Sequence, residues 1–247
     1  MKRLFSIIAA ILLLSSTAWG GATLDPAQST SVASQSKGVI AHWPLNTESL
    51  MSATVVADDI ADNHATLSTV TVGAEYSEFD GADSEVDIGA KVVDDGNITW
   101  SAWIYPQGEG ENANEYIYDN GKFIVIWVDD ADKISVYSDG STPANSANSA
   151  VPISSWYHIA ITRPTAGTNT NIYINGVLSG TANQNSGTPA TGSGNGIIGN
   201  YYTSTIRTFD GYIAHVKVRN YLATTAEITA EYNAGRLGSK TTINPAL

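Results

Sequence analysis

Short apolar runs separated by turn-forming residues constrain the fold of this chain more than any other feature. From Gly38 to Arg219, alternating or continuous apolar runs recur between clusters of Gly, Asn, Asp and Pro. This spacing is typical of an all-β sandwich or barrel, because two-residue periodicity buries one face of each strand. We expect strands at 38–45, 64–72, 76–80, 84–88, 97–106, 115–119, 122–128, 133–138, 155–163, 169–174, 177–183, 196–201 and 207–219.

Two local signals refine this pattern. Asn175-Gly176 lies between IYI and VL, and this dipeptide tolerates the positive φ angles of a type I′ hairpin turn. Strands 169–174 and 177–183 should therefore pair. One helix is predicted near the C-terminus, because Thr224 and Glu227 form a T-x-x-E capping box and Gly235 can end the helix.

The N-terminal residues have the pattern of a secretory signal peptide. Lys2 and Arg3 precede an apolar run that is shorter than the roughly 20 residues of a membrane-spanning helix, and small residues follow it. The mature protein should be secreted or periplasmic, without a membrane span. We expect a signal peptide at 1–20, a flexible leader at 21–37, one domain at 38–236 and a C-terminal tail at 237–247.

The net charge limits the kinds of ligand that the protein can bind, and the absence of cysteine limits how the fold can be stabilised. The chain has no cysteine, so its stability must come from a hydrophobic core. Its formal net charge is -12, and about -14 once Lys2 and Arg3 are removed with the signal peptide. Nucleic acid is disfavoured as a partner, because phosphate binding requires clustered Lys and Arg. Calcium and neutral glycans are compatible with this charge.

Six segments resemble, in order, successive parts of laminin G-like, concanavalin A-like jelly rolls. The resemblance implies a two-sheet antiparallel sandwich with one short C-terminal helix. Such modules commonly bind glycans, proteins or surface polymers, and often carry calcium at one rim. The segments are GVIAHWPLN (38–46), FDGADSEVDIG (79–89), ITWSAWIYP (98–106), SWYHIAITRP (155–164), IYINGVLSG (172–180) and FDGYIAHVKVRNYLATTAEITAEYNAG (209–235).

A calcium site is one hypothesis. The loop ADDIADNHA places three acidic residues close together, and calcium prefers several oxygen ligands in a flexible loop; they are Asp58, Asp59 and Asp62. The resemblance implies a further acid in a late segment similar to I-D-E-V, where this chain has Ile213-Ala214-His215-Val216; Asp210 could substitute. The alternative is a solvated turn whose side chains hydrogen-bond their own backbone.

Aromatic and polar residues at strand ends suggest a ligand site. Sugar rings stack on Trp and Tyr, while Asn and Asp hydrogen-bond sugar hydroxyls. Ordinary aromatic side chains at the rim are the alternative. Trp43, Trp103 and Trp156, within strands, are expected in the core. The candidate ligand-binding residues are Tyr118, Asp119, Asn120, Trp127, Asp129, Asn200, Tyr201 and Tyr202.

A catalytic interpretation depends on Glu85-Val86-Asp87-Ile88. This run resembles the start of the E-x-D-x-x-E strand of some concanavalin A-like glycoside hydrolases, which need two carboxyl groups. The second catalytic position is occupied here by Gly89 or Ala90. We therefore expect a non-catalytic protein that binds extracellular carbohydrate or a cell-surface polymer, with calcium as a candidate cofactor. The alternatives are an assembly or adhesion subunit of an envelope or particle surface and, third, a hydrolase with a degenerate strand.

Overall fold

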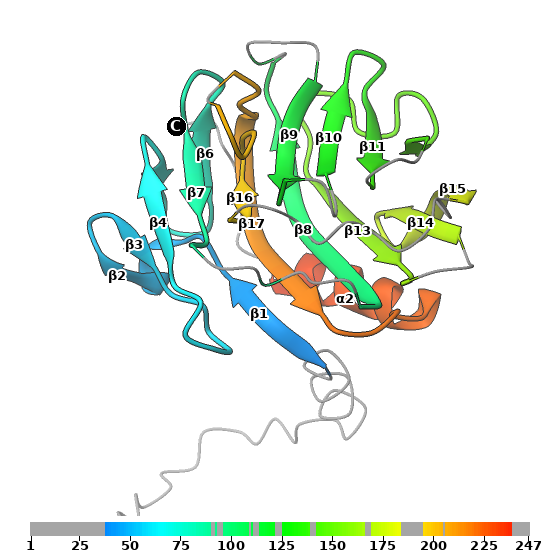
Figure 1. The fold of residues 1–247 in the computed structure, drawn as a ribbon, viewed down its shortest axis with the longest axis horizontal. Helices are drawn as coiled ribbons and strands as arrows, with labels where there is room; N and C mark the ends of the chain where they lie inside the picture. Colours follow the sequence, from blue (N-terminus) through cyan, green and yellow to red (C-terminus); the bar gives the residue numbers. More distant parts are fainter. Residues whose placement is uncertain are drawn as a thin grey trace, which may run out of the picture.

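Two antiparallel sheets packed face to face, with one helix outside them, form the protein (Figure 1). The computed structural model describes residues 38–89, 92, 96–108, 110, 114–121, 125–138, 142–165, 169–183, 195–204 and 206–238. The expected signal peptide, the leader and residues 239–247 of the tail lie outside these ranges. The predicted jelly-roll sandwich is confirmed.

One sheet, here called sheet A, is built around the long strand β17. It has eight strands, and β1 pairs with the second half of β17 while β6 pairs with the first half. The strands, from one edge, are β15 (Val177–Asn183), β14 (Asn169–Ile174), β13 (Tyr157–Arg163), β8 (Ile98–Pro106), β17 (Asp210–Arg219), β6 (Ser77–Asp80) and β5 (Thr71–Val72), with β1 (Val39–Trp43) beside β17.

The opposing sheet, sheet B, has nine shorter strands, and the short 3-10 helix η1 (Thr47–Ser49) leads into its edge strand β2. The chain crosses between the sheets several times, for example at the turn from β6 to β7. The strands, from one edge, are β12 (Ala144–Asn145), β11 (Lys133–Tyr137), β10 (Val125–Asp129), β9 (Asn114–Asp119), β16 (Ile197–Ile198), β7 (Glu85–Asp87), β4 (Ala65–Ser68), β3 (Val55–Val56) and β2 (Leu50–Ser52).

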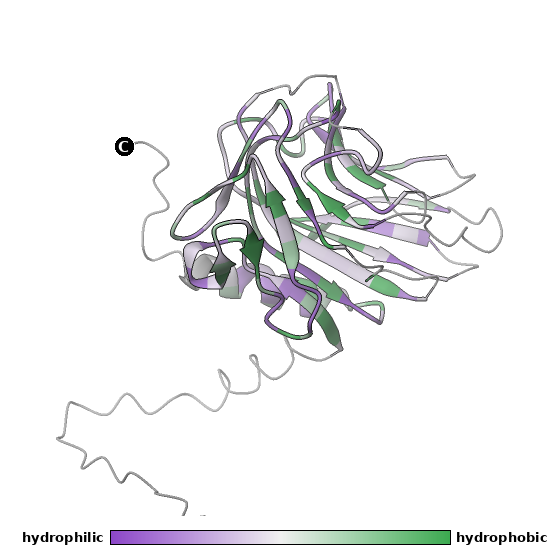
Figure 2. Ribbon diagram, turned by 60° about the vertical axis from the view of Figure 1, so that its left-hand side comes forward, coloured by the Kyte–Doolittle hydropathy of each residue, from purple (hydrophilic) through white to green (hydrophobic). Residues whose placement is uncertain are grey.

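Apolar side chains from both sheets fill the space between them. Figure 2 shows hydrophobic residues along the strands of both sheets. Trp100 of sheet A and Tyr118 of sheet B are fully buried, with ring centroids 5.7 Å apart. Trp43 is buried in this core as predicted, but the core assignment of Trp103 and Trp156 is wrong. Trp103 alternates along β8 with the core residues Ala102 and Ile104, so it faces outward from sheet A.

Helix α2 (Thr225–Gly238) covers part of the outer face of sheet A. Its predicted capping box is present: the Glu227 N–H donates to Thr224 Oγ1 over 3.2 Å, and the Thr224 N–H donates to Glu227 Oε2 over 2.8 Å. The predicted end at Gly235 is wrong, since the helix continues to Gly238. No helix in the described part of the chain is long and apolar enough to cross a membrane.

The strand predictions fail mainly where strands are very short. Asn175 and Gly176 have φ angles of 51° and 78° and join β14 to β15, as predicted. The expected strand 64–72 instead splits into β4 of sheet B and β5 of sheet A, with Thr69 at φ 53° between them. Strands β2, β3 and β12 have only two or three residues and were not predicted.

Candidate functional site

Four aromatic side chains and one arginine meet on the outer face of sheet B. We call this group the aromatic platform: Tyr116, Trp127, Tyr201, Tyr202 and Arg207. The Tyr116 and Trp127 rings stack with centroids 5.9 Å apart, and Tyr201 meets Tyr116 edge-on at 5.6 Å. Tyr202 lies 5.4 Å from Tyr201, and Cζ of Arg207 lies 5.2 Å from the Tyr116 ring centroid. All five side chains are partly exposed.

A β-bulge in β9 directs Tyr116 to this face. Tyr118 pairs with Ile126 and Tyr116 pairs with Trp127, so Ile117 is the extra residue. Ile117 and Tyr118 both point into the core, while Tyr116 points outward. The cross-strand pair of Tyr116 and Trp127 thereby brings two aromatic rings together.

Asn200 positions the segment that carries the other half of the platform. Its side chain is fully buried, and its amide donates to Thr208 Oγ1 over 2.9 Å. Its Oδ1 accepts from the Tyr201 N–H at 2.8 Å and the Arg207 N–H at 3.3 Å. One buried amide therefore fixes the backbone on both sides of the turn, and with it the directions of Tyr201 and Arg207.

The buried side chain of Asp119 stabilises the backbone of the aromatic platform. Its carboxylate is fully buried and accepts hydrogen bonds from the Gly121 N–H at 2.7 Å and the Tyr202 N–H at 3.4 Å. Burial raises its pKa to about 6, although these hydrogen bonds and the charge of Arg207 oppose the rise. Asp119 thus holds Tyr202 in place and is not accessible to a ligand.

The structure separates the eight predicted ligand residues into two groups. Trp127, Tyr201 and Tyr202 belong to the platform, and Asp129 lies on the same face, where it pairs with Lys133 at 2.9 Å. The other four are buried: Tyr118, Asp119, Asn120 and Asn200. Tyr116 and Arg207 were not predicted. Two-residue alternation from Tyr118 would have placed Tyr116 correctly only if the bulge had been known.

The Glu85 and Asp87 pair faces outward on the same side of sheet B. Ile197 pairs with both Asp87 and Asp119, and paired residues share a face. Burial, then the charges of Asp87 and Asp83, raise the pKa of Glu85. Asp87 accepts hydrogen bonds from the Gly89 N–H at 2.7 Å and the Asn195 amide at 3.2 Å. Gly89, at one of the two positions considered for the second catalytic carboxylate, offers no such group.

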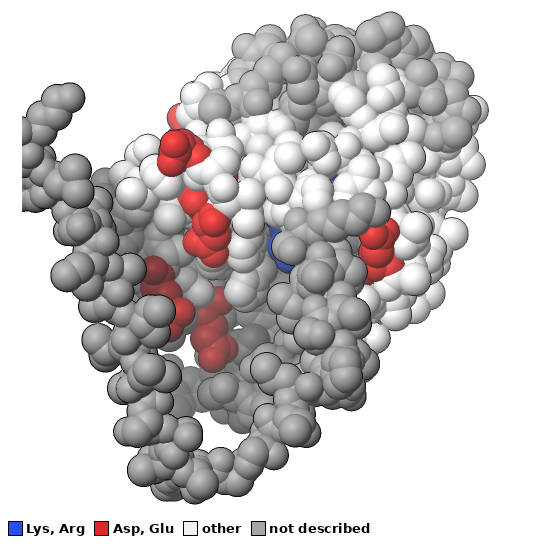
Figure 3. Space-filling model, turned by 90° about the horizontal axis from the view of Figure 1, so that it is seen from below, with Lys and Arg blue, Asp and Glu red and all other residues white. Residues whose placement is uncertain are grey.

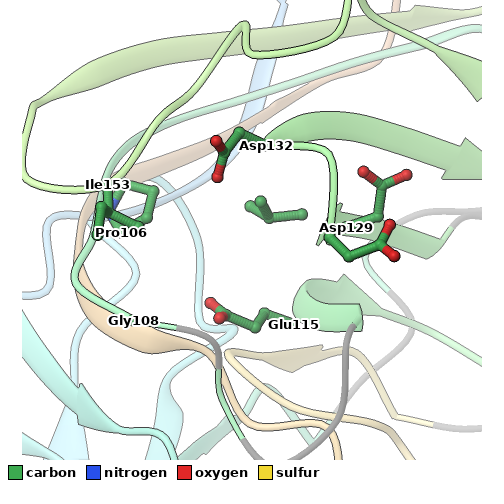
Figure 4. A pocket seen from close by; sticks show the side chains of 8 residues that line it. Pro106, Gly108, Glu115, Asp129, Asp132 and Ile153 are labelled. Carbon is green, nitrogen blue, oxygen red and sulfur yellow. The ribbon is translucent and has the colours of Figure 1, made fainter.

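A pocket of about 240 Å³ opens at the rim between the two sheets (Figure 4). Several carboxylates surround it, together with Pro106, Gly108, Val128 and Ile153; they are Glu115, Asp129, Asp130 and Asp132. The Glu115 carboxylate accepts hydrogen bonds from the Gly110 N–H at 2.6 Å and the Asp210 N–H at 3.3 Å. Within the described ranges, no three acidic or histidine side chains are grouped closely enough to hold a metal ion.

The predicted calcium ligands are not brought together. Both oxygens of Asp58 accept hydrogen bonds, from the His42 N–H of strand β1 and, within the loop, from the Ile60 N–H and the Asn63 amide, at 2.9 to 3.0 Å. Asp59 and Asp62 are exposed.

Asp210 lies far from that loop. It begins β17, whereas the loop contacts His42, which pairs with Lys217 seven residues further along the same strand. At the rise of an extended strand, this separation is roughly 23 Å. Asp210 and Asp58 are therefore too far apart to bind the same calcium ion.

Among the charged residues that Figure 3 shows on this face, the acidic ones predominate: Asp and Glu form several separate groups, whereas little of Lys and Arg is visible. This agrees with the twofold excess of acidic over basic residues in the sequence. Of the platform's five members, only Arg207 carries a full positive charge.

Residues 80–229 match the family model of the concanavalin A-like lectin/glucanases superfamily. No curated protein sequence matches this chain. A Trypanosoma rangeli sialidase in complex with sialic acid is similar in structure, with 12% identity, a TM-score of 0.62 and coverage of 81% of this chain and 33% of the sialidase. The botulinum neurotoxin serotype D binding domain has 12% identity and a TM-score of 0.64, covering 84% and 53%. The chain thus spans about a third of the sialidase and half of the toxin domain.

Proposed function

The chain belongs to the concanavalin A-like lectin/glucanases superfamily, and we propose that it is an exported, non-catalytic protein that binds carbohydrate or a cell-surface polymer. The proposed binding site is the aromatic platform. The single observation that carries the proposal is the contact of Tyr116, Trp127 and Tyr201 on an outer sheet face.

The platform has the chemistry that a sugar ring requires. Partly exposed aromatic faces pack against the apolar C–H groups of a sugar, and the Tyr hydroxyls at their edges can hydrogen-bond its hydroxyls. The ring directions are fixed in advance by the bulge in β9 and by Asn200, so little side-chain entropy is lost on binding. A polar rim lies close by, in Glu85, Asp87 and Asn195.

The structural neighbours are consistent with a carbohydrate ligand, but they do not identify the ligand of this chain. One is a sialidase in complex with sialic acid and another is a toxin binding domain. At 12% identity the likeness concerns the fold, and a fold hosts many unrelated sites. The proposal therefore depends on the platform itself.

The proposed absence of catalysis follows from the carboxylates on this face. A glycosidase needs one carboxylic acid and one carboxylate that both reach the substrate. Glu85 stands at the first catalytic position of the E-x-D-x-x-E comparison, but Gly89, at one of the two positions considered for the second, has no carboxyl group. The Asp87 carboxylate already accepts hydrogen bonds from Gly89 and Asn195, and Asp119 is fully buried. A stacked sugar would thus be held and not cleaved.

The test is glycan-array binding by Trp127→Ala and Tyr201→Ala proteins. Each substitution removes a stacking face and should weaken binding by roughly tenfold or more, as aromatic hot spots do. Trp156→Ala is the matched control, because this half-exposed Trp lies on the outer face of sheet A, against Tyr212. Unchanged binding by the two platform variants, with melting temperatures near that of the unmodified protein, would refute the assignment.

An assembly or adhesion subunit is the second candidate. Val177 and Leu178 at the tip of the β14–β15 hairpin are 68% and 50% exposed, which suits a protein contact. Size-exclusion chromatography with light scattering separates the two functions. A stable oligomer that dissociates in Val177→Ser and ignores sugars would favour assembly, whereas a monomer that binds glycans would favour the platform.

A further inference from the structure

Arg207 is held in a defined position at the edge of the aromatic platform. Its backbone N–H donates to Asn200 Oδ1 over 3.3 Å, and its carbonyl accepts from the Tyr116 N–H at 2.9 Å. Its guanidinium carbon lies 5.2 Å from the Tyr116 ring centroid, within cation–π distance. The backbone and the side chain of Arg207 are both fixed relative to the aromatic platform.

Among the described residues, the guanidinium of Arg207 contacts the Tyr116 ring but forms no ion pair. Lys133 pairs with Asp129, and Lys217 and Arg219 pair with Glu231, each at 2.9 Å. In the part of the chain that the structure describes, no carboxylate lies within ion-pair distance of Arg207. Asp119 is near enough to feel its charge, but its oxygens accept from Gly121 and Tyr202.

We propose that the ligand of the aromatic platform is an acidic glycan whose sugar carboxylate forms a bidentate ion pair with Arg207. This inference depends on the platform being the glycan site. The planar guanidinium presents paired N–H donors that match the two oxygens of a carboxylate. The neighbouring Trp127 and Tyr201 rings would receive the apolar face of the same sugar.

The charge of the protein makes this assignment specific. With a net charge of -12, the protein repels anionic ligands over most of its surface, and Glu85 and Asp87 add to this repulsion on the same face. An acidic sugar is therefore stable only with its carboxylate at Arg207, which fixes its orientation. A neutral sugar would gain no ion pair and would partly desolvate the guanidinium without compensation.

The experiment compares matched acidic and neutral ligands. Oligogalacturonides and sialyllactose are titrated alongside carboxyl-reduced oligogalacturonides and lactose, with sulfated dextran as a non-carboxylate anion. The proteins are the unmodified chain, Arg207→Gln, Arg207→Lys, Trp127→Ala and Lys133→Gln. Lys133→Gln removes one positive charge from the same face, but that charge is already paired with Asp129.

We expect at least one carboxylated ligand to bind about tenfold or more tightly than its neutral counterpart. Arg207→Gln should lower the affinity for the carboxylated ligand to about that for its neutral counterpart, and Arg207→Lys should restore only part of the preference. Lys133→Gln should change little.

Three results would overturn the inference. If Trp127→Ala abolishes binding while Arg207→Gln leaves the acidic preference intact, or if neutral ligands bind as tightly as acidic ones, the glycan site stands and the role of Arg207 is refuted. Binding of sulfated dextran alone would refute the carboxylate. No binding to any ligand would count against both the inference and the proposed function.

Discussion

Asp58 holds the loop between β3 and β4 through a single buried carboxylate. Replacing it with Ala removes the acceptor for three hydrogen bonds, from His42, Ile60 and Asn63, and leaves buried donors unsatisfied. We expect the free energy of unfolding to fall by about 2 to 4 kcal/mol, measured by urea denaturation.

Asp62→Ala is the matched control, because Asp62 is an exposed acid in the same loop and should change stability by less than about 0.5 kcal/mol. Equal effects at both positions would show that the loop is stabilised by general charge and not by the Asp58 hydrogen bonds.

For single residues, the sequence predicted part of the aromatic platform but missed Tyr116 and Arg207. Trp127, Tyr201 and Tyr202 were predictable, because aromatic residues stand there beside turn-forming residues. Tyr116 was not, because the bulge at Ile117 turns Tyr116 outward while Tyr118 faces the core. Arg207 was missed because its partner, Tyr116, lies 91 positions earlier in the chain and only the fold brings them together.

Among the elements, helix α2 shows how packing can reverse a helix propensity. Gly235 is inside the helix, where Ala would ordinarily stabilise by about 1 kcal/mol. A Cβ there would lie 2.6 Å from Cζ2 of Trp103, whose ring is held between His158 and Tyr232. We therefore expect Gly235→Ala to lower the free energy of unfolding by about 1 to 3 kcal/mol.

Asn233→Ala, an exposed position of the same helix, provides the comparison for Gly235→Ala and should be neutral or slightly stabilising. Chemical denaturation of both variants measures the difference. If Gly235→Ala proved the more stable of the two, the close contact with Trp103 would be refuted. The same contact explains why the helix end was wrongly predicted at Gly235. In a sequence, a glycine that is required for close packing cannot be distinguished from a glycine that ends a helix.

For the whole molecule, the class of fold followed from the repeated short strands, because alternation must bury one face of each strand against another layer. The sequence could not show where the chain changes sheets. Residues 64–72 look like one strand, yet Thr69 adopts a positive φ and sends β4 and β5 into different sheets. Strands of two residues, such as β3, carry too little periodicity to be recognised.

The stability of the molecule should fall as the pH falls, because buried charges join helix α2 to sheet A. Glu231 accepts a hydrogen bond from Lys217 at 2.9 Å, forms an ion pair with Arg219 at 2.9 Å and lies beside His158. Burial lowers the pKa of His158 from 6.5 to about 4, against the charge of Glu231. Burial would raise the pKa of Glu231, but Lys217, His158 and Arg219 outweigh it and hold that pKa at about 2.

Between pH 6.5 and 4 the unfolded chain therefore binds a proton at His158 that the folded protein does not, and from pH 4.5 to 2 the same holds at Glu231. Both groups favour unfolding on acidification. Glu231→Gln should lower the free energy of unfolding at pH 7 by about 3 to 5 kcal/mol, because it leaves buried cations without a counter-charge. It should also flatten the decline below pH 4.5. Urea titrations from pH 7 to 3, with the exposed Glu78→Gln as control, would contradict this if the Glu231→Gln curve ran parallel to that of the unmodified protein.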